Sequence, residues 1–234
     1  MAVDARQLRT LIAVLLLVAF ILFPIYWMTV TAHLPTSIVL SRHPPLLPPP
    51  GEMSFEAFRR ALERRPFLTW MFNTGVVAVG ATLLSLVIST LAGYSLSRYR
   101  SRLQEASGLV LLFSKMLPGS LIVIPFFIMA TRAGMIDSRL ALILANTSVG
   151  VPFATWMMKG FFDAIPREID AAATIDGCTR LQALRHVVLP IARPGLTAAA
   201  IYLFIVAWAD FVFARTLINS PELWTLTTGL ASFV

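Results

Sequence analysis

Long apolar runs alternate with shorter polar segments along the chain, which is the hydrophobic pattern of a protein with several membrane spans. A run of about 20 apolar residues can cross a hydrocarbon layer of about 30 Å as a helix. The pattern predicts these spans: 11–30, 70–96, 108–130, 140–162 and 196–214. Because the chain reaches Val234 inside another apolar stretch, we expect a sixth span beyond it.

Composition supports this interpretation and excludes others. Of the 234 residues, 57% are hydrophobic and 13% are charged, whereas soluble domains carry about 25% charged residues. The net charge of +7 comes from short basic clusters beside apolar runs, which is typical of membrane topology signals and not of a nucleic-acid surface. Cys178 is the single cysteine, so a disulfide framework is excluded.

The first apolar run follows Arg6 and Arg9, as a signal peptide would. Its apolar part is too long for one and lacks a clear cleavage site, so an uncleaved span is the better interpretation. Lys and Arg are slightly more numerous in the segments that would share a side with the N-terminus. This bias favours a cytoplasmic N-terminus.

The polar stretch between the first two spans contains a proline-rich segment, Pro44 to Pro50, and then an expected short helix that Ser54 can cap. That helix has one apolar and one basic face, formed by Phe55, Phe58 and Leu62 and by Arg59, Arg60, Arg64 and Arg65. Such a helix rests on a membrane surface or packs on its own loop, and the sequence leaves both open.

Small side chains recur every fourth residue along the second span, at Ala81, Ser85, Ser89, Gly93 and Ser97. Helices in lipid associate by close packing, so this ridge predicts a helix–helix contact face.

The third span is expected to be broken at Pro118-Gly119 and again at Pro125. A proline also lies inside the fourth span, at Pro152.

A polar insert at 163–195 predicts two short helices. Pro166 suits a first helical turn, Asp170 lies near the positive end of the helix dipole, and Gly177 suits a left-handed helix end. Thr179 and Gln182 form a capping-box pattern that opens the second helix. We expect Pro190 to stop that helix. A hairpin of this kind without a catalytic group is typical of a docking device.

The run from Ile165 to Gly177, with Leu189-Pro190 after it, resembles the EAA loop of bacterial ABC importer permeases. In that family the loop sits in a cleft of the cytoplasmic ATPase. The resemblance implies ATPase-coupling roles for Asp170, Ala171, Ala172, Ala173, Asp176, Gly177, Leu189 and Pro190. The family's acidic residue falls on Ala171, and Asp170 points about 100° away around the helix.

Two further segments, Asn73-Thr74 and 204–211, resemble maltose-type permeases. The resemblance implies an all-α, polytopic type I ABC importer permease (MetI-like) helical bundle, with residues 1–234 forming a single permease domain in a bacterial inner membrane. It also implies a second permease subunit, two ABC ATPase subunits that bind ATP and magnesium, an extracytoplasmic solute-binding protein and a carbohydrate-type solute. No cofactor is expected in this chain.

Polar residues inside the spans are candidates for the translocation path: Lys115, Asn146, Ser148, Trp208 and Asp210. Buried ionisable groups in lipid are costly and often functional. Lys115 either lines the path or extends to the interface, and Asn146 and Ser148 either meet solute or bridge helices. Asp210 is expected to cap or brace an outer gate more than to bind solute.

Other function classes fit the sequence less well. It has no metal-binding H-E-x-x-H, no G-x-S-x-G elbow and no G-x-x-x-x-G-K-[ST] phosphate loop, so we expect neither an enzyme nor the ATPase itself. The alternative is a secondary transporter, which would often show inverted repeats that are not evident here. The sequence leaves open a sugar, a polyol or a glycerol-phosphate ester as solute.

Overall fold

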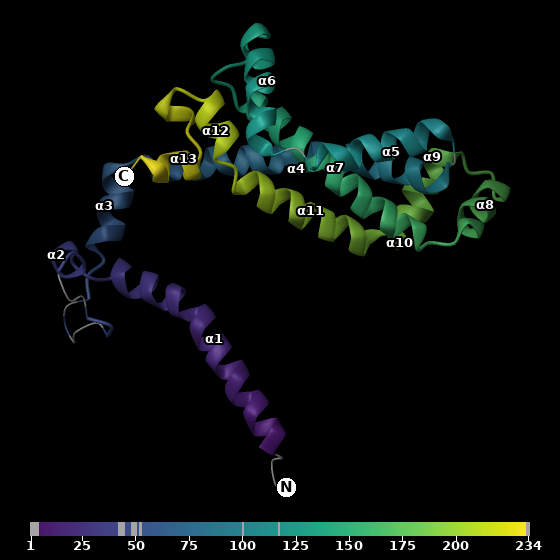
Figure 1. The fold of residues 1–234 in the computed structure, drawn as a ribbon. Coiled ribbons are helices and arrows are strands. Elements are labelled where there is room, and N and C mark those ends of the chain that lie inside the picture. The colour runs from purple at the N-terminus through teal and green to yellow at the C-terminus, as the bar shows by residue number, and fades with distance from the viewer. Residues whose placement is uncertain are drawn as a thin grey trace. The chain divides into compact units, whose positions relative to one another are not determined.

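A computed structural model describes residues 5–41, 45–47, 51, 53–99, 101–116 and 118–232, and within these ranges the regular elements are helices (Figure 1). The chain divides into two compact units, Met1–Pro66 and Phe67–Val234, and each is described by itself.

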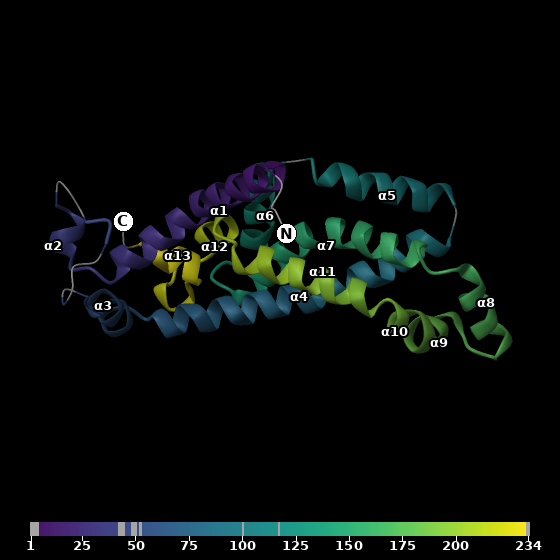
Figure 2. The ribbon, with the colours of Figure 1, turned by 90° about the horizontal axis from the view of Figure 1, so that it is seen from below.

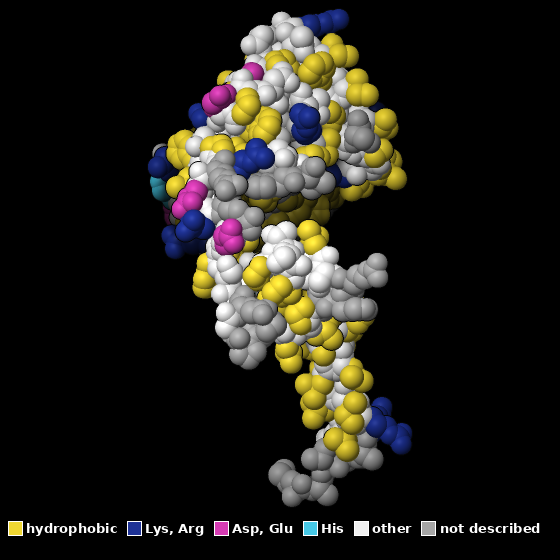
Figure 3. Space-filling model, turned by 90° about the vertical axis from the view of Figure 1, so that its left-hand side faces the viewer, with side chains coloured by type: hydrophobic (Ala, Val, Ile, Leu, Met, Phe, Trp, Pro, Cys, Tyr) yellow, Lys and Arg dark blue, Asp and Glu magenta, His cyan; other side chains and the backbone are white. Residues whose placement is uncertain are grey.

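The first unit consists of α1 (Ala5–Ala32), α2 (Thr36–Val39) and α3 (Glu56–Arg64). Helix α1 contains the expected 11–30 run and exposes apolar side chains along its length, such as Phe20, which is 79% exposed (Figure 3). An apolar surface along a whole helix is unfavourable in water and favourable in the hydrocarbon of a membrane. The Tyr26 hydroxyl donates to the Leu46 carbonyl at 2.6 Å and ties the following loop to α1.

Helix α3 begins at Glu56, one residue later than a cap at Ser54 predicts. The Ser54 hydroxyl still accepts the Glu56 N–H at 3.1 Å. Phe55 and Phe58 pack on the His33 ring, with centroids 5.1 and 5.2 Å apart. The apolar face is therefore partly used inside this unit. These parts of the expectation lie outside the described residues or side chains: Pro44, Pro48 to Pro50, Arg60 and Arg64.

The second unit is built on three long helices, α4 (Phe67–Arg98), α7 (Arg139–Asp163) and α11 (Arg193–Trp208), which lie side by side (Figures 1 and 2). They contain or begin the expected runs at 70–96, 140–162 and 196–214. Pro152 lies inside α7 without ending it.

The small-residue ridge of α4 is confirmed as a contact face, since each of its members is buried. A Cβ atom added at Gly93 would lie 2.9 Å from the Lys159 backbone nitrogen and 2.9 Å from the Thr155 carbonyl oxygen. Only glycine allows α4 and α7 to approach so closely.

The third span, expected over 108–130 with a break at Pro118-Gly119, is broken there as predicted. It forms α5 (Arg102–Ser114) and α6 (Gly119–Arg132), separated at Lys115–Pro118. Helix α5 lies along the bundle, whereas α6 stands away from its long axis (Figures 1 and 2). Proline restricts the residue before it and removes an N–H group, which explains the separation at Pro118. The second expected break is wrong, because Pro125 lies inside α6.

The expected fifth span, 196–214, ends early. Helix α11 stops at Trp208, and α12 (Val212–Leu217), a 3-10 turn η2 (Pro221–Leu223) and α13 (Leu226–Ala231) follow. Within the described residues, α1 from Arg6, α4 and α7 are long and apolar enough to cross a membrane. A fourth candidate is the pair Arg180–Ile191 and Arg193–Trp208, which is bent by 82°.

Candidate functional site

The insert at 163–195 forms a helical hairpin at one end of the bundle (Figure 1). We call this end the hairpin end. The hairpin contains α8 (Arg167–Ile175), α9 (Arg180–Ala183), a π-helical turn (Leu184–Val188) and α10 (Leu189–Ile191).

The local signals at the end of α8 are confirmed. Gly177 has φ +86°, the left-handed conformation that favours glycine. The Cys178 N–H donates to the Ala173 carbonyl at 3.0 Å, and the Gly177 N–H donates to the Thr174 carbonyl at 3.1 Å. This pair of bonds is a Schellman motif.

The capping box that opens α9 is also confirmed. The Thr179 N–H donates to Gln182 Oε1 at 2.8 Å, and the Gln182 N–H donates to Thr179 Oγ1 at 3.4 Å. Each of the two side chains thereby accepts the other residue's backbone N–H, which would otherwise lack a partner at the start of the helix.

Two expectations about the prolines are corrected. Pro166 is the residue before α8 and not part of its first turn. Pro190 does not stop the second helix, which continues to Ile191 and bends at Ala192. Pro190 stands in the first turn of α10, where a missing N–H is tolerated.

The two faces of α8 differ. Ala171 and Ala172 are exposed, and Ile175 is 87% exposed, so this part of the outer face is small and apolar, with the exposed Glu168 one turn before it. Ala173 is buried against the bundle. Of the other proposed coupling residues, Asp176, Gly177 and Pro190 are exposed and Leu189 is half-buried.

Asp170 lies on the inner face and forms an ion pair with the last residue of α4. Its Oδ2 lies 2.9 Å from Arg98 Nε, and the two side chains are only 19% and 7% exposed. The Tyr94 hydroxyl donates to Asp170 Oδ1. The resemblance implies an ATPase-coupling role for Asp170, and its carboxylate points into the bundle.

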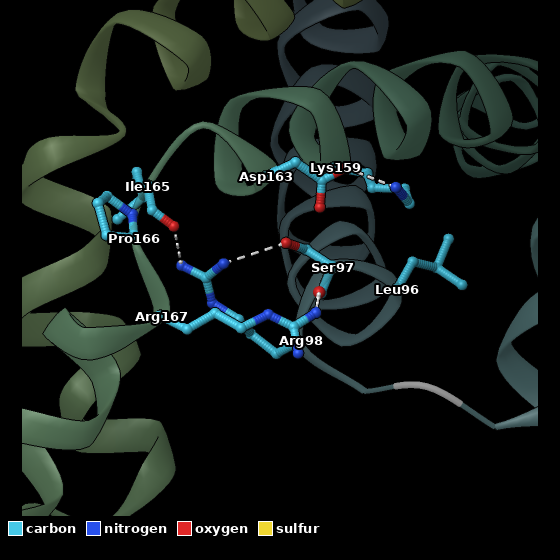
Figure 4. A pocket seen from close by; sticks show the side chains of 8 residues that line it. All are labelled: Leu96, Ser97, Arg98, Lys159, Asp163, Ile165, Pro166 and Arg167. Atoms are coloured by element: carbon cyan, nitrogen blue, oxygen red, sulfur yellow. Dashed lines mark hydrogen bonds and ion pairs between the residues drawn. The ribbon is translucent and has the colours of Figure 1, made fainter.

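The Arg98 guanidinium also holds the C-terminal end of α7. Nη1 donates to the Phe162 carbonyl at 2.9 Å, and Nη2 donates to the Ile165 carbonyl at 3.1 Å. In the opposite direction, Arg167 Nη2 donates to the Ser97 carbonyl at 2.8 Å. Figure 4 shows these side chains reaching across the gap between the two elements.

We call Arg98, Tyr94 and Asp170, with the carbonyls of Phe162 and Ile165, the Arg98 clamp. It joins α4, α7 and α8 through one side chain that is planar and has fixed donor directions. Sequence reasoning missed Tyr94 and Arg98. Their spacing of four residues at the end of α4 puts them on one helix face, which was the available signal.

Beneath the clamp, the hairpin shares an apolar core with the long helices. Tyr94 of α4, Phe162 of α7, and Leu184 and Val188 of the hairpin belong to one buried cluster. The rings of Tyr94 and Phe162 meet edge to face at 5.6 Å. The hairpin therefore packs on the bundle as one body with the ends of α4 and α7.

The opposite end of the bundle contains a second polar junction, centred on the fully buried Asn73. Asn73 Nδ2 donates to the carbonyls of Glu222 and Trp224 at 2.8 and 2.9 Å, and Oδ1 accepts from Arg139 Nε at 3.0 Å. The Thr74 hydroxyl accepts the Leu226 N–H at 2.8 Å. These bonds hold the segment around η2 against the start of α4.

Asp137, in the loop before α7, supports the same end. It has φ 62° and accepts the N–H groups of Asn219 and Ser220 at 2.8 and 2.9 Å. The hydrogen bonds from Ser220 hold the pKa of this carboxyl below its usual value.

Two of the five translocation-path candidates meet. Asn146 Nδ2 donates to Asp210 Oδ2 at 3.3 Å. Asp210 lies in the break between α11 and α12, not inside a span as expected, and accepts the N–H groups of Phe213 and Ala214 at 3.2 Å each. Its carboxylate thus satisfies the start of α12.

The other three candidates form no described hydrogen bond with Asn146 or Asp210. The Ser148 hydroxyl donates to the Ala145 carbonyl of its own helix at 2.7 Å. Trp208 stacks on Phe204 with ring centroids 5.4 Å apart. Lys115 follows the end of α5 at the break before α6. Among the described residues, no group of three His, Cys, Asp or Glu side chains could hold a metal ion.

Comparison with known proteins gives a consistent picture. Residues 85–232 match the family described as the binding-protein-dependent transport system inner membrane component. The maltodextrin transport system permease protein MdxG of Bacillus subtilis is 36% identical over 79% of this chain and 66% of its own length. The diacetylchitobiose uptake system permease protein DasC of Streptomyces coelicolor is 34% identical over 94% of this chain and 79% of its own.

A solved structure has the same fold. It is a bacterial ABC transporter involved in the import of the acidic polysaccharide alginate, and the match has a TM-score of 0.85. The match covers 99% of this chain and 82% of that one at 24% identity.

Removing either charge of the Arg98 clamp should loosen the hairpin. Arg98→Gln leaves the Asp170 carboxylate buried without its cation. Asp170→Asn leaves the Arg98 guanidinium buried without its anion. Breaking a buried pair costs about 3–5 kcal/mol, and the double variant should lose less than the sum of the two. Unfolding of the purified protein and the rate of tryptic cleavage after Arg167 or Arg180 measure the effect.

Glu63→Gln is the control, since its partner Arg59 is 74% exposed and such pairs are worth at most about 1 kcal/mol. Clamp variants that unfold and are cleaved like the Glu63→Gln variant would contradict the role assigned to the pair.

Proposed function

The chain belongs to the family of binding-protein-dependent transport system inner membrane components, and from this premise we propose that it is the solute-conducting permease subunit of an ATP-driven importer. Residues 1–234 act as a single permease domain in a bacterial inner membrane, with the N-terminus in the cytoplasm. The chain itself is non-catalytic, and ATP and magnesium bind to partner ATPases.

The observation that carries the proposal is the division of α8 into two faces. Its outer face presents Ala171, Ala172 and the exposed Ile175 to a partner. Its inner face is fastened to α4 through Asp170 and Arg98. A partner that moves α8 therefore moves the ends of the long helices. A secondary transporter, the alternative, has no use for such a surface.

The proposed mechanism is alternating access. Closure of the two ATPases on ATP displaces the hairpin, and the Arg98 clamp passes that displacement to α4 and α7. Asp170 acts in this step as an internal strut and not as an ATPase contact. The outward-facing state then receives solute from an extracytoplasmic binding protein. A second, homologous permease subunit completes the path.

The relatives named for maltodextrin and diacetylchitobiose uptake favour a carbohydrate-type solute, and a polyol or glycerol-phosphate ester is related chemistry. The candidate path residues have different roles. Asn146 and Asp210 brace the start of α12, because Asn146 donates to the Asp210 carboxylate, which accepts the N–H groups of that helix. Ser148 and Trp208 are the candidates left for solute hydroxyls and rings, and Lys115 lies at the hinge-like break before α6.

Docking by shape predicts a specific mutational pattern. Ala172→Trp should release the ATPase, because a large ring on the exposed ridge prevents close contact. Ala171→Glu should be tolerated or slightly strengthening, since an exposed ion pair adds at most about 1 kcal/mol and salt screens it. The measurement is the amount of ATPase retained on the purified permease across a salt series.

Ala133→Trp, an exposed alanine after α6, is the control and should retain the ATPase. Retention by Ala172→Trp equal to the control, with loss of ATPase from every variant at modest salt, would show that charge and not shape holds the complex.

The proposed orientation can be measured separately. Cys178, in the hairpin, should react with an impermeant maleimide only from the cytoplasmic side. In a Cys178→Ser background, Leu46→Cys should react only from outside, because α1 separates it from the N-terminus. Labelling of both cysteines from one side overturns the orientation.

A further inference from the structure

Two adjoining cavities lie at the hairpin end of the bundle. The first, about 350 Å³, is lined by polar groups and opens between the ends of α4 and α7 and the start of α8 (Figure 4). The second, about 400 Å³, lies between α4, α5 and α7 and is mostly apolar. Leu96 and Lys159 line both cavities, so the two lie side by side.

The first cavity has an excess of positive charge. Arg98, Lys159 and Arg167 line it together with the acid Asp163, and because Arg98 is paired with Asp170 in the clamp, one cation remains in excess. Lys159 Nζ contacts Asp163 Oδ2 at 2.5 Å. The one described hydrogen bond of the Arg167 guanidinium goes to the Ser97 carbonyl, a neutral acceptor. The cavity therefore favours an anion that can accept several hydrogen bonds, as a phosphate group can.

The second cavity has the character of an acyl-chain groove. Leu96, Leu109 and Trp156 form its walls, and Gly108 leaves its floor open. A Cβ atom at Gly108 would lie 3.6 Å from the Trp156 ring and 3.8 Å from Leu96, which is ordinary contact. Trp156 Nε1 donates to the Gly108 carbonyl at 3.2 Å and holds α5 beside α7. Glu105 is the acid at its edge.

The polar cavity and the apolar cavity beside it match the headgroup and the acyl chain of a phospholipid at the end of the bundle where α4 and α7 end. A cationic pocket beside an apolar groove at the end of a spanning helix has the arrangement of a headgroup site followed by a hydrocarbon site. Lys159 lies at their junction, with its ammonium 5.7 Å from the centroid of the Trp156 ring.

We propose that this paired cavity binds one anionic phospholipid, with its phosphate between Lys159 and Arg167 and an acyl chain along Gly108 and Trp156. The site is separate from the solute path and from the outer face of α8. It does not depend on the identity of the solute.

The test is lipid retention by the assembled transporter, measured by native mass spectrometry with phosphatidylglycerol and phosphatidylcholine of identical chains. The parent should retain phosphatidylglycerol preferentially. Lys159→Gln should lower that preference about fivefold, the effect expected of one cation near an anionic headgroup. Gly108→Leu fills the groove and should lower retention of both lipids, whereas Gly108→Ala, the matched control, should retain them like the parent.

Three results overturn the proposal: equal retention of the two lipids by the parent, an unchanged preference in Lys159→Gln, or displacement of phosphatidylglycerol by glycerol phosphate alone as effectively as by the whole lipid. The last result would identify a free phosphate site. If Gly108→Leu fails to assemble, Leu109→Asn tests the same wall, because Leu109 is 52% exposed and its replacement leaves the core intact. Retention unchanged by Leu109→Asn then counts against the groove.

Discussion

The buried guanidinium of Arg98 is the interaction on which the hairpin end depends. A charged side chain that is only 7% exposed needs a partner charge and hydrogen bonds to offset its lost hydration. Here one planar group meets the Asp170 carboxylate of α8 and two carbonyls at the end of α7. The ends of α4, α7 and α8, which are far apart in the sequence, are thereby held at fixed distances. The hairpin cannot tilt without moving α4 and α7.

This constraint explains why the faces of α8 can have different tasks. The inner side chains of Asp170 and Ala173 are committed to the bundle. The exposed Ala171 and Ala172 remain free of large groups, so a partner can approach the backbone closely. The departure from the family pattern at Ala171 removes one charge from the outer face and leaves the inner strut intact. The same rigid end also borders the paired cavity, because Arg98 and Arg167 line its polar half.

The sequence was most informative where structure is local. The Schellman end at Gly177 and the capping box at Thr179 require only a few neighbouring residues, and both were predicted correctly. The small-residue ridge was also predictable, because a period of four defines one helix face. The contacts of Asp170 could not be predicted, because Tyr94, which donates a hydrogen bond to it, is 76 residues away along the chain and only the fold brings the two together.

The errors have the same origin. Apolar composition extended the fifth run beyond Trp208, where α11 ends. The expected break at Pro118-Gly119 is present, but Pro125 and Pro190 are tolerated inside helices that they were expected to break or stop. Asp210 looked like a charge within a span, but its carboxylate serves the free amides at the start of α12. A polar residue in an apolar run can therefore mark a helix end and not a binding site.

The central claim is that the Arg98 clamp transmits ATPase motion to the spanning helices. The direct measurement is solute uptake per ATP hydrolysed by the complete transporter in proteoliposomes, for the parent and for Arg98→Gln and Arg98→Lys. The account predicts that both variants retain the ATPase and hydrolyse ATP, while uptake per ATP falls strongly in Arg98→Gln and less in Arg98→Lys, which keeps the charge but not the fork of donors. Uptake per ATP equal to that of the parent in Arg98→Gln would contradict the account.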